Sequence, residues 1–139
     1  MTAEKMNIDT AVKIFNKSCK LASVAYNVAI YNAGFRHMTQ NKRARNIVRL
    51  NNLMINAVKD FHRLQAAAIN AESMFHGENA PLLNELAQFA RNNYLTAREH
   101  LIHAIVHYVN FYGEELMTYK KAREIDLDTF IQFIKLDID

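Results

Sequence analysis

The stretch 42–75 constrains the fold of this chain more than any other, because its apolar residues recur at alternating steps of three and four. This spacing aligns them along one side of an α-helix and excludes a strand, which would need a period of two. At about 1.5 Å per residue, the helix would be roughly 50 Å long and would need long helices as partners. The repeating residues are Ile47, Leu50, Met54, Ala57, Phe61, Leu64, Ala68, Ala71 and Phe75.

The stretches on either side show the same period, and cap and turn residues divide the chain between them. Small apolar residues recur at helical spacing over 11–33, and larger ones over 83–112. Glycines at 34, 77 and 113 are candidate helix stops, which places the end of the second helix at His76. The candidate N-caps are Asp9 or Thr10 for the first helix, Thr39 or Asn41 for the second, and Asn79 ahead of Pro81 for the third.

The segment 125–139 alternates acidic with large apolar residues. Asp126 or Asp128 would cap a short helix over 129–136, although the β-branched and aromatic content also allows a strand. Such a segment either closes its own bundle or docks into a groove on a partner or a second copy.

We therefore predict an all-α protein, an antiparallel bundle of three long helices plus a short C-terminal helix, forming a single domain over 1–139. A chain of this length can bury one core, and its single cysteine cannot close an internal disulfide. Neither a signal sequence nor a membrane-spanning stretch is evident, so we expect a cytoplasmic protein without a membrane partner. Because three helices leave apolar residues beside the main seam uncovered, we also expect a homo-oligomer, in the first place a dimer.

Charge is distributed unevenly along the chain. No carboxylate occurs between Asp9 and Asp60, whereas nine lysines and arginines do. Residues 1–59 carry ten basic and two acidic side chains, net +8, and residues 60–139 carry seven and twelve, net −5. Such asymmetry indicates a surface that faces a polyanion, or two halves that attract each other.

Apart from Arg43, which is adjacent to Lys42, the basic residues fall at helical spacing, on the side of each helix opposite its apolar seam. Lysine and arginine neutralise phosphates by releasing counterions, and interleaved asparagines donate hydrogen bonds to phosphate or sugar. The candidate binding residues are Lys42, Arg43, Arg45, Arg49, Asn52, Asn56, Lys59 and Arg63 on the second helix, and Lys13, Lys17 and Lys20 on the first. We expect the cluster from Lys42 to Arg49 to be the centre of this surface.

Two binding hypotheses follow for a protein without enzymatic activity or cofactor. The leading one is a small nucleic-acid-associated or polyanion-associated subunit that contacts backbone phosphates through its basic helix face. The alternative is a protein-interaction module, an inhibitor or adaptor, whose basic face meets an acidic protein surface. A polyanion binder loses affinity steeply with salt, whereas a specific protein partner depends on a few anchor residues.

The third helix carries a row of histidines, His100, His103 and His107, on its polar side. Glu99 lies one turn before His103, and ligands one turn apart occur in metal sites. A complete site would need ligands from another helix, so we predict a hydrated or hydrogen-bonded polar stripe and no metal.

The hexapeptide Arg98-Glu-His-Leu-Ile-His103 resembles the signature of the HEPN superfamily of small helical ribonucleases. This resemblance covers six residues only. It implies a catalytic pair, Arg98 and His103, at a dimer interface, with His103 as the acid-base group. An HEPN-like ribonuclease is the last of the three hypotheses.

Overall fold

The computed structural model describes residues 6–34, 39–72, 77–110, 117–136 and 138. All regular elements in these residues are helices, without any strand, which confirms the all-α prediction. The helices are α1 (Ile8–Gly34), α2 (Gln40–Glu72), α3 (Ala80–Val109), α4 (Tyr119–Glu124) and α5 (Leu127–Leu136). None of the helices in the described residues is long and apolar enough to cross a membrane.

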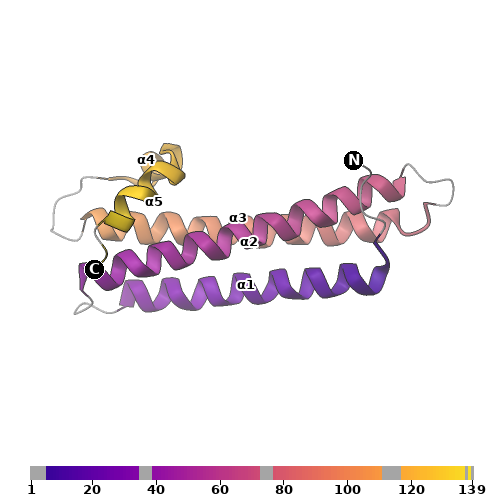
Figure 1. The fold of residues 1–139 in the computed structure, drawn as a ribbon, viewed down its shortest axis with the longest axis horizontal. Coiled ribbons are helices and arrows are strands. Elements are labelled where there is room, and N and C mark those ends of the chain that lie inside the picture. The colour runs from indigo at the N-terminus through magenta and orange to yellow at the C-terminus, as the bar shows by residue number, and fades with distance from the viewer. Residues whose placement is uncertain (1–5, 35–38, 73–76, 111–116, 137, 139) are drawn as a thin grey trace.

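The three long helices lie side by side and pack against one another in all three pairs (Figure 1). Helix α2 runs antiparallel to α1 and α3, which confirms the predicted bundle. The short helices lie at the end where α1 finishes and α2 begins, with α4 packed against α3 and α5 packed against α2. Helix α4 follows the candidate stop at Gly113 and was not predicted as a separate element.

The predicted seam of α2 forms the core. Ile47, Leu50, Ala57, Phe61, Leu64, Ala68 and Ala71 are all buried. Met54 is partly buried, and Phe75 lies outside the described residues. Buried apolar side chains form two clusters, whose α2 members end at Leu50 in the first and begin at Phe61 in the second. Polar groups are buried between these clusters, among them Ser18, which accepts a hydrogen bond from the Asn93 amide at 2.8 Å.

Two of the predicted caps are confirmed. Thr39 Oγ1 accepts from the Lys42 backbone N–H at 3.1 Å, and Asp126 Oδ1 accepts from the Thr129 N–H at 3.3 Å. Asn79 precedes α3, with proline in the first turn, but its side chain makes no capping hydrogen bond. The predicted start of α1 is wrong, because Asn7 Oδ1 caps it by accepting from the Thr10 N–H at 2.8 Å. Ile8 packs onto the apolar cluster at this end, which extends the helix beyond the predicted caps.

The C-terminal segment is helical over Leu127–Leu136. Helix α5 buries Ile131 and Ile134, each 2 % exposed, in the first cluster, so a strand in this segment is excluded. The expected helix stops at His76 and Gly113 lie outside the described residues. Within the described residues, α2 ends at Glu72 and α3 ends at Val109.

Candidate polyanion-binding surface

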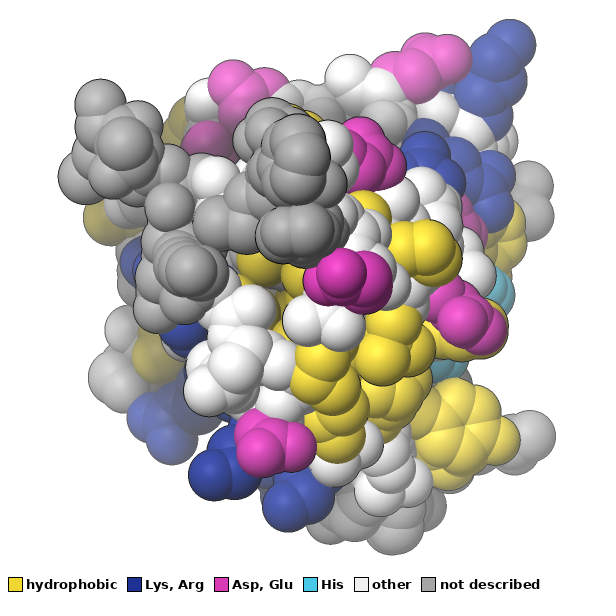
Figure 2. Space-filling view, turned by 90° about the vertical axis from the view of Figure 1, so that its right-hand side faces the viewer, with side chains coloured by type: hydrophobic (Ala, Val, Ile, Leu, Met, Phe, Trp, Pro, Cys, Tyr) yellow, Lys and Arg dark blue, Asp and Glu magenta, His cyan; other side chains and the backbone are white. Residues whose placement is uncertain are grey.

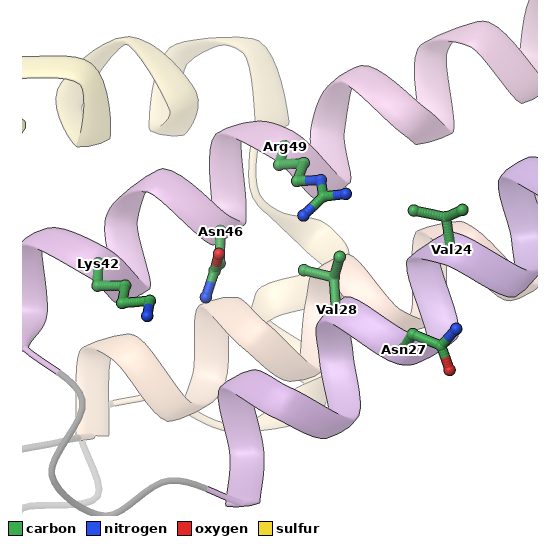
Figure 3. Close-up of a pocket in the computed structure, with 6 residues that line it drawn as sticks. All are labelled: Val24, Asn27, Val28, Lys42, Asn46 and Arg49. Atoms are coloured by element: carbon green, nitrogen blue, oxygen red, sulfur yellow. The ribbon is translucent and has the colours of Figure 1, made fainter.

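A groove between α1 and α2 forms a basic concavity among the described residues. It encloses a cavity of about 530 Å³, lined by Val24, Asn27 and Val28 of α1 and by Lys42, Asn46 and Arg49 of α2. We call these six residues the α1/α2 groove. Figure 3 shows the two valines directed toward α2, and Lys42, Asn46 and Arg49 extending toward α1. Val24 and Val28 give the groove an apolar floor, and the lysine, arginine and asparagine side chains form its walls. None of the six residues is a carboxylate.

The predicted basic face of α2 is exposed to solvent. Its exposed members, called the basic stripe below, are Lys42, Arg45, Arg49, Asn52, Asn56, Lys59 and Arg63. Two of them, Lys42 and Arg49, also line the α1/α2 groove. At about 1.5 Å per residue, the stripe extends roughly 30 Å along α2. It therefore continues the positive charge of the groove toward the other end of the bundle.

The three candidate lysines of α1 are also exposed, and one of them is joined to α2. Lys17 Nζ lies 3.6 Å from Asp60 Oδ1, and its side chain is 63 % exposed. Because α1 and α2 are antiparallel, this contact sets Lys13, Lys17 and Lys20 alongside the second half of α2, beyond the groove. Both helices therefore contribute cations along their shared edge.

Arg43 does not lie on this surface, and its predicted place at the centre of the basic face is wrong. Its side chain is 6 % exposed. The physical reason is helical phase, since Arg43 precedes the buried Ile47 by one turn and shares its side of α2. Arg43 acts on α3 instead: the pKa of His107 is lowered by burial first, then by the charges of His103 and Arg43.

Asp60 is the one carboxylate of α2 before its last turn, and it is turned inward. It is 2 % exposed, and burial raises its pKa above the ordinary value, while Lys17 and then Arg63 oppose this rise. The Asp60 Oδ2 atom is buried and has no hydrogen-bond partner in the described residues. Asp60 therefore adds little negative charge to the surface, and it depends on Lys17 for compensation.

Replacement of Lys17 by alanine is expected to lower the free energy of unfolding by about 1–3 kcal/mol at pH 7, because a buried carboxylate loses its partner. Lys17 favours the ionised form of Asp60, so its contribution is present at neutral pH and disappears as falling pH protonates Asp60. Urea denaturation of the native and variant proteins between pH 3 and pH 7 measures both effects. Lys13→Ala, at an exposed position of the same helix, serves as the control. A deficit that is unchanged at low pH would contradict this account.

The histidine row of α3 faces α4 and α1. The His103 ring packs against Tyr119 with centroids 4.6 Å apart, and His100 meets Tyr26 edge-on at 5.6 Å. Burial is the main cause of the lowered pKa of both His100 and His107. The part of the chain that the structure describes holds no group of three or more His, Cys, Asp or Glu side chains arranged for a metal ion.

The two residues of the HEPN-like pair both contact α4. Arg98 Nη2 donates to the Arg123 carbonyl at 3.2 Å, and His103 packs on Tyr119. Arg123 in turn binds Glu99 through two hydrogen bonds of 3.0 and 2.9 Å, which lowers the pKa of Glu99. Arg98, Glu99 and His103, on the polar side of α3, therefore hold α4 against α3.

The binding residues predicted from the sequence did not include four of the six groove residues. Asn46 lies one turn beyond Lys42, in the series 42, 46, 49 that follows the α1 side of α2. Val24, Asn27 and Val28 line the same groove from α1. The spacing of each helix held this signal, but matching the two series requires the register of α1 against α2.

The opposite end of the bundle has a different surface character. Figure 2 looks at the end where α1 and α3 begin and shows hydrophobic side chains in the middle of that face, with acidic side chains among and around them. Exposed carboxylates at this end include Asp9, Glu72, Glu78 and Glu85. The α1/α2 groove lies near the other end and has Lys42 and Arg49, with no carboxylate among the described residues that line it.

Comparison of the chain with protein-family models, curated proteins and solved structures found no match.

Proposed function

We propose that this protein binds a polyanion, in the first place the backbone of a nucleic acid, along the edge shared by α1 and α2. One observation carries the proposal: Lys42, Asn46 and Arg49 line the cavity between these helices, no carboxylate is among the described residues that line it, and the cavity continues into exposed cations on both helices. The binding involves no chemical step.

The chemistry of the groove suits a phosphate-bearing chain. Lys42 and Arg49 supply charge and donors for phosphate oxygens, and the amides of Asn27 and Asn46 can donate to phosphate or sugar. Backbone contacts of this kind fix position without reading bases, so the expected binding tolerates many sequences.

Fluorescence polarisation with labelled single-stranded and duplex oligonucleotides of unrelated sequence tests the proposal. Contacts of Lys42, Arg45 and Arg49 with three phosphates predict that the logarithm of the binding constant falls linearly with the logarithm of salt concentration. The slope is expected to be about −2.7 for duplex and about −2.1 for single strands. Comparable binding of all sequences with such slopes is the expected result. No binding by the folded protein at 50 mM salt would refute the proposal.

A protein with an acidic surface is the second candidate partner, and the apolar floor of the groove favours it. Val24 and Val28 offer a seat for an apolar side chain, which a phosphate backbone does not supply. Such a partner would leave free oligonucleotides unbound in the polarisation assay. Its affinity would depend on one or two anchor side chains rather than on the whole basic stripe.

A further inference from the structure

Helix α5 presents a second surface that the proposed function does not use. Asp126 at its N-cap and then Thr129, Phe133 and Leu136 are exposed at steps of three, four and three, which places them along one side of the helix. The side chain of Phe133 is 64 % exposed and that of Leu136 is 81 % exposed. Two neighbouring apolar anchors on one helix side are the pattern by which a helix enters a groove.

The opposite side of α5 is already engaged within the bundle. Ile131 and Ile134 are buried in the cluster that also contains Ile47 and Leu50 of α2. In the described residues α5 packs against α2 and makes no comparable contact with α1. The exposed side of α5 therefore does not fill the α1/α2 groove of its own chain.

The groove and the exposed side of α5 are complementary in chemistry. The groove offers Val24 and Val28 as a floor and Lys42 and Arg49 as walls, in a cavity of about 530 Å³. The segment around α5, residues 124–139, carries five carboxylates and one lysine. Two apolar anchors on a helix side that begins at the exposed Asp126 thus match an apolar floor flanked by cations.

We propose that the exposed side of α5 of one copy docks into the α1/α2 groove of a second copy, with Phe133 and Leu136 as anchors. The contact joins two different surfaces, so it is heterologous and produces rings or open chains, depending on closure. It also occupies the groove, so self-association and polyanion binding compete; this last consequence rests on the proposed function.

Two variants, each changed in one of the two surfaces, test the contact. Phe133→Asp with Leu136→Asp removes the anchors and keeps the groove, whereas Lys42→Glu with Arg49→Glu reverses the groove charge and keeps α5. All four positions are exposed, and circular dichroism verifies folding. Light scattering at 10–200 µM and low salt is expected to give a native mass at least twice the 16.1 kDa of one chain. Each double variant alone is expected to stay at the mass of one chain.

The decisive sample is the equimolar mixture of the two double variants. Each contributes the surface that the other has lost, so the mixture is expected to form a dimer that cannot grow further. Leu82→Asp, at an exposed leucine of α3, is the control and keeps the native mass. A monomeric native protein, association of either double variant alone, or a mixture that stays monomeric would each overturn the proposal.

Oligonucleotide binding separates this inference from the proposed function. The variant without anchors keeps its groove, so it is expected to bind oligonucleotide at least as tightly as the native protein. If it binds no oligonucleotide while the mixture still dimerises, the proposed function fails and the docking contact stands. If it binds oligonucleotide and the mixture stays monomeric, the docking contact fails and the proposed function stands.

Discussion

Simultaneous replacement of Lys42, Arg45 and Arg49 by alanine is expected to remove most of the salt dependence of oligonucleotide binding. Loss of three phosphate contacts reduces the slope on duplex by about 2.7, which removes a roughly 40-fold change in affinity between 50 and 200 mM salt. Fluorescence polarisation of the native and variant proteins across this range measures the slope. The three side chains are exposed, so the fold is expected to persist.

The control for this variant carries the same change in charge elsewhere on the molecule. Lys120, Lys121 and Lys135 are exposed on α4 and α5, outside the groove and the basic stripe. Their replacement by alanine is expected to leave the slope within about one unit of the native value, because distant charges are largely screened. Equal losses in the two variants would mean that net charge alone governs binding, and would contradict a localised site.

Arg43 stays unchanged in that variant because it is buried, although the sequence placed it among the surface residues. The apolar seam was predictable because its period repeats over about four heptads, so an error at one residue does not shift the pattern. Arg43 was grouped with its neighbours by adjacency in sequence. Adjacent residues on a helix point about 100° apart, and the phase of Arg43 follows Ile47 into the core.

The groove could not be predicted from the sequence, for a different reason. The basic character of both helices was visible in the sequence, but the cavity depends on Val24 and Val28 facing Asn46 across an interhelical register. The periodicity of one helix shows which of its sides is buried. It does not show how far that helix is shifted along its axis relative to a neighbouring helix. In the structure, the contact between Lys17 and Asp60 shows that register. A buried aspartate opposite a lysine of another helix can be recognised only when the positions of both helices are known.

At the starts of α2 and α5, one of the two candidate residues predicted from the sequence forms the N-cap. Thr39 and Asp126 each combine a side-chain acceptor with an N–H three residues later, and both were predictable. At the start of α1 several adjacent residues can all serve as caps. Tertiary packing of Ile8 then decided in favour of Asn7, which no local rule specifies.

Replacement of Leu101 by alanine is expected to lower the free energy of unfolding by about 3 kcal/mol, because Leu101 is 0 % exposed in the α3 part of the first cluster. Leu82→Ala, a leucine of the same helix that is 41 % exposed, is expected to cost less than about 1 kcal/mol. Urea denaturation compares the two. Similar losses at both positions would contradict the placement of Leu101 in the core.

The Leu101 variant also tests whether fold and binding reside in different residues. Leu101 lies on α3, whereas all six groove residues lie on α1 and α2. A domain stable by about 5–15 kcal/mol remains folded after a loss of about 3 kcal/mol. Its oligonucleotide affinity at 25 °C should then equal that of the native protein, just as the triple variant should lose affinity at unchanged stability. Weaker binding by a folded Leu101→Ala protein would instead mean that packing of α3 sets the spacing between α1 and α2.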